Sequence, residues 1–425
     1  MNATQPAARV STMESRASRI PLFAMLAANA ISGAGNVMSR LAIPWFVLET
    51  TGSAARTGIV GAVEAIPLVI AGVFGGALVD RLGFRRMSVI ADLASGATVA
   101  IIPTLHFTIG LEFWQLLLLV FAGALLDSPG QTARRSFVPE LAEAAGVPLT
   151  AANGYFGAIN RSTVLIGPLI AGVFIALAGA APLLWIDAGT FVVSAVLMLA
   201  FVPRALEPEG ETAGPVTSYW SELADGFRWI AGSSLIRTLI VMVLLTNLIE
   251  SPFVIVLTVY AREVYDSSVA LGLLLGVFSI GAIVGSMLSG AVAERVTGRR
   301  LFPLGFGAVC VLYLTLIVQP AIAVVLAVSF VVGLSAAPMN PFLDTVFQER
   351  VPRHMRGRVF GLRSALMMAS TPIGILAGGT LVEATGLVTT IAIQLAMLLA
   401  VVVWMIFSPT LKQVDGGSDV PMSKA

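Results

Sequence analysis

The sequence has almost none of the residues from which disulfides and metal centres are built. Its 425 residues include one cysteine, Cys310, and two histidines. A single cysteine excludes a disulfide framework and a cysteine-ligated metal cluster, and two histidines leave little for a histidine site. No P-loop sequence occurs, so direct coupling to nucleotide hydrolysis has no supporting residues. We therefore expect no metal, no cofactor and no catalytic residues.

Charged residues are also scarce. They make up 12% of the chain, against 57% hydrophobic residues, and the formal net charge is only +1. A water-soluble globule of this size needs more polar surface than that. A nucleic-acid partner is disfavoured as well, because no basic face or basic tail could neutralise a run of phosphates. The composition therefore predicts a protein that lies in the lipid bilayer.

Long apolar segments are what the chain does contain. A helix needs about 20 apolar residues to cross the hydrocarbon of a bilayer. By this measure the sequence predicts twelve membrane-spanning helices and an all-α membrane protein, with short loops everywhere except in the middle of the chain. The predicted spans are Leu22–Leu48, Gly58–Val79, Met87–Thr108, Phe113–Ala133, Asn153–Ala178, Pro182–Val202, Ile236–Ala261, Val269–Ala293, Leu301–Val318, Ala321–Thr345, Val359–Glu383 and Leu387–Phe407.

The Lys and Arg residues predict the orientation of these spans. Of the 25 Lys and Arg residues, 20 fall in segments on the side of the chain termini, and only Arg56 and Arg262 fall in loops on the other side. The remaining three, Arg40, Arg161 and Arg363, lie within spans. Because cytoplasmic loops of membrane proteins are enriched in these residues, we expect both termini to lie in the cytoplasm.

The arrangement of the spans predicts two pseudo-symmetric six-helix halves. The predicted parts are a cytoplasmic N-terminal segment (residues 1–21), a first bundle (22–203), a cytoplasmic linker (204–235), a second bundle (236–408) and a cytoplasmic tail (409–425). Prolines and glycines interrupt the first part of the linker. In its second part Trp220, Leu223, Phe227 and Ile230 fall on one helical face, which predicts a helix in the membrane interface.

A charged motif occurs once in each half. Residues 75–86 read GGALVDRLGFRR and residues 290–300 read GAVAERVTGRR, each between two apolar spans. Small residues let helices approach closely, and an acid among arginines could form a charge cluster in one conformation and release it in another. We predict a gate, with a solvated loop as the alternative. Its residues are Gly76, Asp80, Arg81, Gly83, Arg85, Arg86, Glu294, Arg295 and, near the end of the fourth span, Asp127.

The first copy of this motif resembles the G-x-x-x-D-R-x-G-R-R signature of the major facilitator superfamily, with the basic pair displaced by one residue. On the fifth span, Gly167, Pro168 and Gly172 resemble the G-P-x-x-G-G element of antiporters in that superfamily. Proline kinks a helix and small residues permit close contact, although an ordinary packing kink would look the same. Phe137-Val-Pro-Glu140 and Ala152-Asn153-Gly154 add a similarity to its drug-efflux branch, which includes macrolide and siderophore exporters.

This resemblance implies a major facilitator fold in the inner membrane of a bacterium, and we expect a monomer. It also implies a small-molecule substrate and, for an antiporter, protons as a second partner. One feature departs from the pattern, because the fourth span lacks the R-x-x-x-G sequence of many proton-coupled drug antiporters. Asp127 stands in that region, and we predict that it belongs to the gate rather than to a proton site.

Charged residues within the spans are candidates for contact with substrate or protons. A charge at the bilayer centre costs at least ~2.5 kcal/mol, so it needs a partner or a role. Arg40 and Glu64 lie at equal depth on neighbouring spans and could pair, either as a structural bridge or at a transport site. Asp187 is expected to be shallower and solvated. The candidate residues are Asn36, Arg40, Glu64, Asn160, Arg161, Asn247 and Glu250.

These observations predict a secondary transporter that exports amphipathic, drug-like small molecules in exchange for protons, by alternating access. Glu250 is the candidate for the coupling proton, and direct contact with a cationic substrate is an equal alternative. Two other functions stay open at this point. One is a dedicated exporter or importer of a single metabolite, such as a siderophore or sugar-like solute. The other is a membrane protein that binds a ligand without moving it.

Overall fold

The protein is helical throughout the described residues. The computed structural model describes residues 18–206 and 219–411, apart from the side chains of residues 71–77, 80, 205, 219–225, 291–295 and 354. No β-strand occurs in this part of the chain. The all-α fold predicted from the sequence is confirmed.

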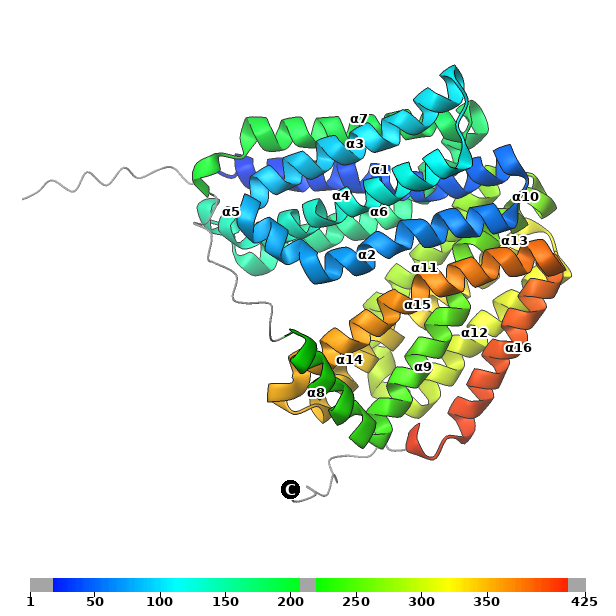
Figure 1. Cartoon of the computed structure of the whole chain (residues 1–425). Coiled ribbons are helices and arrows are strands. Elements are labelled where there is room, and N and C mark those ends of the chain that lie inside the picture. The colour runs from blue at the N-terminus through cyan, green and yellow to red at the C-terminus, as the bar shows by residue number, and fades with distance from the viewer. Residues whose placement is uncertain (1–17, 207–218, 412–425) are drawn as a thin grey trace, which may run out of the picture.

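The N-terminal half forms the upper bundle in Figure 1. Its helices are α1 (Ile20–Thr51), α2 (Ala54–Leu82), α3 (Phe84–Thr108), α4 (Phe113–Ser136), the short α5 (Val138–Ala144), α6 (Leu149–Ala178) and α7 (Ala180–Phe201).

The C-terminal half forms the lower bundle in Figure 1. A 3₁₀ turn, η1 (Arg204–Leu206), follows the first bundle, and a second, η3 (Arg353–Met355), precedes α15. The helices are α8 (Tyr219–Gly232), α9 (Ser234–Glu250), α10 (Phe253–Tyr265), α11 (Ser268–Arg295), α12 (Gly298–Val318), α13 (Ile322–Ala336), α14 (Met339–Arg350), α15 (Arg356–Thr385) and α16 (Leu387–Phe407).

The helices are long and apolar enough to cross a membrane. Within the described residues, eleven helices or consecutive helix pairs meet this requirement by length and composition. Helix α2, some of whose side chains lie outside the description, adds a further helix of 29 residues. The twelve predicted spans are therefore all helical. Their observed ends differ from the predicted ends by a few residues, as for the first span, which runs from Ile20 to Thr51.

Two of the predicted spans are broken in the middle. The seventh consists of α9 and α10, separated at Ser251 and Pro252, and the tenth consists of α13 and α14, separated at Ala337 and Pro338. Pro252 and Pro338 directly precede α10 and α14. Proline has no N–H to donate and its ring clashes with the preceding turn, so a continuous helix is interrupted there. The break places Glu250 at a helix C-terminus instead of in a helix interior.

The helix predicted in the second part of the linker is present as α8, and its place in the membrane interface stays a prediction. Its two described apolar positions differ, because Phe227 is 62% exposed and Ile230 only 6%. Gly226 lies against the backbone of Arg358, where a Cβ atom would come within 3.1 Å of the Arg358 carbonyl oxygen. Helix α8 therefore packs on α15 through one face, and Phe227 lies on its exposed face. The predicted positions Trp220 and Leu223 lie outside the described side chains.

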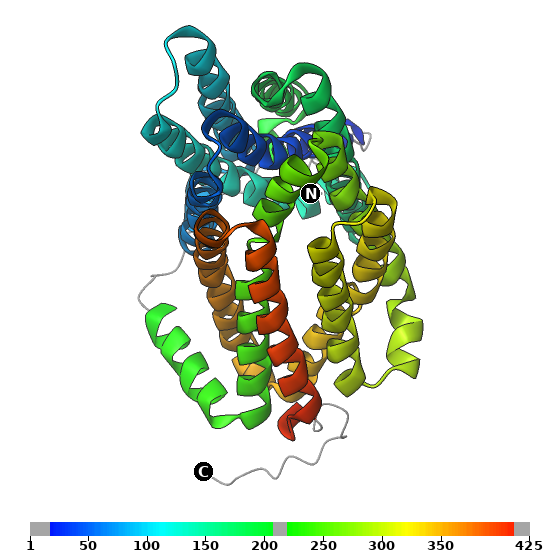
Figure 2. The same ribbon diagram turned by 90° about the vertical axis from the view of Figure 1, so that its right-hand side faces the viewer.

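The helices run between two ends of the molecule. One, which we name the Gly52 end, carries the turns at Gly52, Gly110, Gly179 and Gly386. The other, named the Gly83 end, carries Gly83 and the beginning of α1. In Figure 1 the two bundles converge at the Gly52 end, on the right, and diverge toward the Gly83 end. Figure 2 looks onto the Gly52 end and shows the N-terminal helices lying across the top of the C-terminal ones.

Backbone contacts hold the bundles together at the Gly52 end. Helix α2 packs on α15 and α6 packs on α11. A Cβ atom on Gly58 would lie 2.8 Å from the Cα atom of Gly379, and one on Gly172 would lie 3.1 Å from that of Gly272. Side chains this small allow two helices to touch along their backbones. The Ser268 hydroxyl also donates to the Gly172 carbonyl oxygen at 2.9 Å, so the Gly52 end is closed.

Candidate functional site

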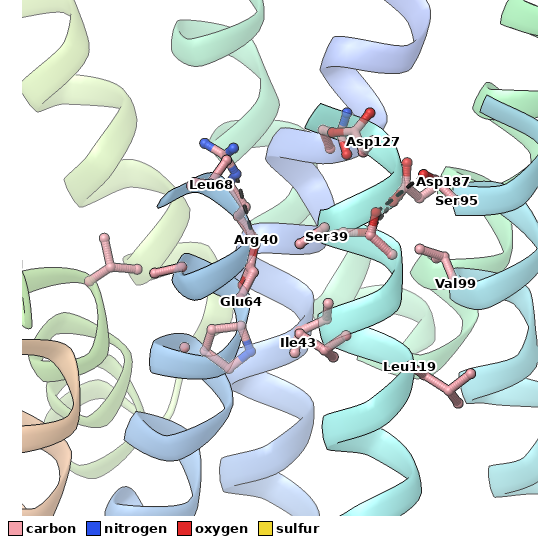
Figure 3. Close-up of a pocket in the computed structure, with 18 of the residues that line it drawn as sticks. Ser39, Arg40, Ile43, Glu64, Leu68, Ser95, Val99, Leu119, Asp127 and Asp187 are labelled. Carbon is pink, nitrogen blue, oxygen red and sulfur yellow. Dashed lines mark hydrogen bonds and ion pairs between the residues drawn. The ribbon is translucent and has the colours of Figure 1, made fainter. Parts of the chain in front are cut away.

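A cavity of about 260 Å³ lies where the two bundles meet. Helices α1, α2, α3, α4 and α7 supply most of its wall, and residues of α10 and α15 complete it from the other bundle. Its lining is largely apolar, with one set of charged and polar side chains (Figure 3). Those side chains are Asn36, Ser39, Arg40, Glu64, Ser95, Asp127, Asp187, Ser251 and Thr371.

Arg40 and Glu64 lie side by side in this cavity. The Arg40 Nε atom is 3.9 Å from the Glu64 Oε1 atom, and the two side chains are 55% and 27% exposed. Their equal depth on antiparallel neighbours, inferred from the sequence, is the reason they meet. The distance is at the limit of an ion pair and the site is open, so the attraction is weak. A role of either residue in transport stays a prediction.

Asp187 is placed differently from what the sequence suggested. We expected it to be shallow and solvated, but its side chain is fully buried. The Ser39 hydroxyl donates to its Oδ2 atom, and the Thr190 hydroxyl lies 3.2 Å from its Oδ1 atom. Position along the chain was a poor guide because α7 packs closely against α1, which covers this face of the helix. Asp187 is thus part of the cavity wall.

Asp127 also belongs to the cavity wall. It lies about nine residues, or ~14 Å, before α4 ends at Ser136. Its side chain is 9% exposed, and Gln131 donates to its Oδ2 atom. Within the described part of the chain its Oδ1 atom has no hydrogen-bond partner. The predicted contact with Asp80 falls outside the described side chains, so the gate role of Asp127 stays a prediction.

A buried polar network that the sequence did not predict lies beyond the cavity, toward the Gly83 end. Arg134 was counted as a loop residue, but it lies in α4 and is 1% exposed. Its Nη1 atom is 2.8 Å from the Oδ1 atom of Asp92 on α3. Asp92 also accepts a hydrogen bond of 2.6 Å from Ser194 on α7, and Arg134 donates to Ser88 at 3.2 Å. Ser88, Asp92 and Ser95 form a polar stripe on an otherwise apolar span, which is the signal that could have revealed this network.

Glu250 and Asn247 lie in a second cavity, of about 190 Å³, inside the C-terminal bundle. The Asn247 amide donates to the Ser370 hydroxyl at 2.7 Å and to the Met367 carbonyl oxygen at 3.0 Å. Among the described residues nothing bonds to the buried Oε1 atom of Glu250. The helix break after Glu250 thus leaves a carboxyl group facing a small cavity that methionine and phenylalanine side chains line.

Asn160 and Arg161 lie apart from both cavities. The Asn29 amide donates to the Asn160 Oδ1 atom at 2.9 Å, which ties α6 to α1. Arg161 is exposed. Neither residue lines the two cavities just described. A direct role for this pair in substrate contact therefore lacks structural support in this conformation.

The predicted gate is only partly within the described structure. The side chains of Gly76, Asp80, Glu294 and Arg295 lie outside it. The expected loop after α2 is a single residue, Gly83, with a φ angle of 81°, so the following arginines lie in the first turn of α3. Arg81 is exposed, whereas Arg85 is buried and donates to the Met198 and Leu199 carbonyl oxygens at the end of α7. Arg86 is exposed.

The glycines and the proline on the predicted kink lie at helix contacts. Gly167 faces α1, where a Cβ atom would come within 2.6 Å of the Val37 side chain. Pro168 and Gly172 lie against α11. Their backbone atoms approach the backbone of Gly272 there. These residues therefore serve the close packing of α6 on both bundles. An antiporter-specific role for them stays a prediction.

Comparison with known proteins identifies the family. A family model described as transmembrane secretion effector matches residues 17–424. The chain belongs to this family of the major facilitator superfamily. A multidrug efflux pump, Tap of Mycolicibacterium fortuitum, is 34% identical over 412 residues, which cover 93% of this chain and 98% of that pump. Macrolide efflux protein A of Streptococcus pyogenes is 20% identical, with 87% of this chain and 91% of that protein covered.

The fold of this family member is also found among solved structures. The nucleoside transporter NupG, in its D323A mutant, superposes with a TM-score of 0.76 and 13% identity, covering 91% of this chain and all of that one. At this identity the likeness shows the major facilitator fold alone. Three predictions are confirmed. The chain is a multi-pass membrane protein, it belongs to a transporter family instead of an enzyme family, and its relatives are those of the drug-efflux branch.

Proposed function

We propose that this protein exports amphipathic organic small molecules across the inner membrane of a bacterium, in exchange for protons. The cavity between the two bundles carries this proposal, because it combines apolar walls with a few charged side chains, as sites for drug-sized molecules do. The similarity to a multidrug efflux pump over nearly the whole chain supports the choice of substrate class. The monomer holds a complete cavity and two bundles, so we infer that one chain is the working unit.

The orientation of the chain follows from its charges. Arginines concentrate at the Gly83 end, so we infer that this end and both termini lie in the cytoplasm. The closed Gly52 end then faces outward, and the protein has the inward-facing conformation in which an exporter takes up its substrate. Alternating access requires that the bundles, residues 22–203 and 236–408, rock about the cavity while residues 204–235 connect them.

Glu250 is the residue that we propose for the coupling proton. It is a carboxyl at a helix break, its Oε1 atom is buried without a partner in the described part of the chain, and it faces a cavity. Such a group can take up and release a proton if water reaches it from one side at a time. Asp80 and the arginines near it are the proposed gate at the Gly83 end, which would hold the bundles together after the cavity opens outward.

The test combines cells and purified protein. A drug-sensitive bacterium with and without the protein is exposed to neutral, cationic and anionic antibiotics, and we expect reduced susceptibility to several apolar compounds. The compound with the largest effect is then loaded into vesicles that contain the purified protein. We expect an imposed pH difference to drive its accumulation and a protonophore to abolish it. An absence of protection across the whole panel, together with an absence of pH-driven flux, would refute the proposed function.

A further inference from the structure

Negative side chains outnumber positive ones around the central cavity. Three carboxyl groups, those of Glu64, Asp127 and Asp187, line it, and among the described lining residues Arg40 is the one positive side chain. They come from α2, α4, α7 and α1, and Figure 3 shows them around one common space. A cleft that is lined mainly by charges of one sign concentrates their electric field. The cavity is therefore matched to a positive ligand.

Two of the three carboxyl groups already have partners. Glu64 lies 3.9 Å from Arg40. Asp187 accepts from the hydroxyl of Ser39 with one oxygen and lies within hydrogen-bond distance of the Thr190 hydroxyl with the other. Each of these acids is thus held by side chains of the protein itself. Asp187 therefore needs no ligand to satisfy its oxygens, and Glu64, which has only the long contact with Arg40, is 27% exposed and within reach of water. Both acids add to the negative potential of the cavity.

Asp127 is the carboxyl group of the cavity wall that has a buried oxygen without a partner among the described residues. It is more than nine-tenths buried, and Gln131, one turn further along α4, bonds to Oδ2. Oδ1 has no partner among the described residues, and the side chain belongs to the cavity wall. A buried carboxylate oxygen without a donor or a cation is costly. A positive group in the cavity would remove this cost, so Asp127 Oδ1 marks where the positive group of a ligand would lie.

The rest of the wall indicates what kind of cation fits. Ile43, Leu68, Val99, Leu119 and Phe191 surround the acids on the side of the N-terminal bundle, and Ile375 adds an apolar side chain from the other bundle. A hydrated metal ion would gain nothing from such a wall, whereas an organic cation would bury its apolar groups against it. The combination of one free carboxylate oxygen and apolar walls favours a bulky organic monocation.

We propose that the central cavity is a selective site for amphipathic organic cations, in which Asp127 Oδ1 contacts the positively charged centre. This proposal rests on the proposed export function and specifies its substrate class. It assigns the cation to the N-terminal bundle and leaves Glu250 in the C-terminal bundle to the proton. The two roles are thus served by carboxyl groups on different bundles, α4 and α9.

Two ions of the same size and opposite charge provide the test. Tetraphenylphosphonium and tetraphenylborate have the same four phenyl groups and differ in the sign of their charge. The purified full-length protein in neutral detergent is dialysed to equilibrium against each ion, with protein-free detergent micelles as the blank. We expect the wild-type protein to bind tetraphenylphosphonium at least ~10-fold more tightly than tetraphenylborate, a difference in binding free energy of about 1.4 kcal/mol.

A conservative variant then locates the selectivity. Asp127→Asn keeps the size of the side chain, and its amide oxygen can still accept from Gln131, so the helix contact survives. We expect this variant to lose at least ~10-fold in affinity for tetraphenylphosphonium and to change little toward tetraphenylborate. The matched control is Asp266→Asn, which removes an exposed carboxylate paired with Arg262 and keeps a residue that suits the left-handed backbone there. The control should bind both ions as the wild type does.

Three results would overturn the proposal of a cation site. The first is that the wild-type protein binds the two ions with equal affinity. This measurement needs no variant, so it tests the proposal even if Asp127→Asn does not fold. Equal losses for both ions in Asp127→Asn, or no loss for either, would also overturn it. The proposed function fails separately: if no compound is moved by a pH difference in vesicles, export is refuted, whereas the charge selectivity of binding is measured without transport.

Discussion

Arg134 and Asp92 form an ion pair that is completely buried in the N-terminal bundle. The distance from Arg134 Nη1 to Asp92 Oδ1 is 2.8 Å, and each side chain is 1% exposed. Ser32 on α1 and Ser88 on α3 accept hydrogen bonds from Arg134, and Ser194 on α7 donates to Asp92. A buried ion pair is not by itself stabilising, but removal of one partner leaves the other charge buried and uncompensated. The pair links α3 and α4 next to the cavity.

The first prediction concerns the stability of this pair. Arg134→Ala or Asp92→Ala leaves one charge buried without its partner, which should cost about 3–5 kcal/mol of stability. Thermal unfolding of the purified protein in detergent measures the loss as a lowered midpoint. Arg135→Ala is the control. The neighbouring Arg135 is exposed, so we expect this variant to unfold like the wild type. If the double variant is as unstable as the two single losses added together, the two side chains do not act as a pair.

The second prediction concerns Arg40 and Glu64. Their 3.9 Å separation and their exposure indicate a coupling of about 0–1 kcal/mol, well below that of Arg134 and Asp92. A double-mutant cycle with Arg40→Ala and Glu64→Ala, read from unfolding in detergent, gives this number directly. A coupling above ~2 kcal/mol would mean that the two residues are drawn together and shielded from water in the dominant conformation.

The third prediction concerns closure of the Gly52 end. Gly58→Ala places a methyl group only 2.8 Å from the Gly379 Cα atom, so the state with a closed Gly52 end loses a close helix contact and the state with an open Gly52 end gains population. A Leu68→Cys reporter in the cavity, in a Cys310→Ser background, should then react faster with a membrane-impermeant maleimide added outside. Gly189→Ala serves as control, because nothing lies within 4 Å of its Cβ position. Unchanged labelling in Gly58→Ala would show that this contact does not seal the outer side.

The fourth prediction concerns the proton. Glu250→Gln permanently resembles the protonated acid, so it should abolish pH-driven accumulation of substrate in vesicles while substrate exchange without a gradient continues. Glu263→Gln, about two turns after Ile255, the last residue of α10 in the wall of the central cavity, should transport normally. Uphill transport by reconstituted Glu250→Gln protein would exclude this residue as the proton carrier.

The fifth prediction concerns the gate. Asp80→Asn keeps the size of the side chain and removes the charge that we expect to hold the arginine cluster at the Gly83 end. Transport should fall severely, while the amount of protein in the membrane stays near that of the wild type. Asp266→Asn again provides the control, because it removes a carboxylate at the opposite end. Normal transport by correctly inserted Asp80→Asn protein would remove Asp80 from the mechanism.

Much of the fold could be predicted because the bilayer imposes a simple rule on the sequence. In hydrocarbon every backbone N–H and C=O must be paired within its own segment, so each long apolar run becomes a helix. This rule gave the spans, the two halves followed from their repetition, and the charged motif with Gly76 and Asp80 indicated the superfamily. The helix break at Pro338 was missed, because hydropathy does not register a proline that an apolar segment tolerates.

The sequence by itself was thus enough to indicate an all-helical transporter and its family. It was also enough to place Arg40 and Glu64 at the same depth on neighbouring helices. Only the tertiary structure decided which charges are buried and with whom. Asp187 and Arg134 lie near the ends of their spans and look solvated from the sequence, but the neighbouring helices cover them completely. Depth along a helix is a property of one segment, whereas burial depends on which other helices pack against its face, and that is set by contacts between residues far apart in the chain.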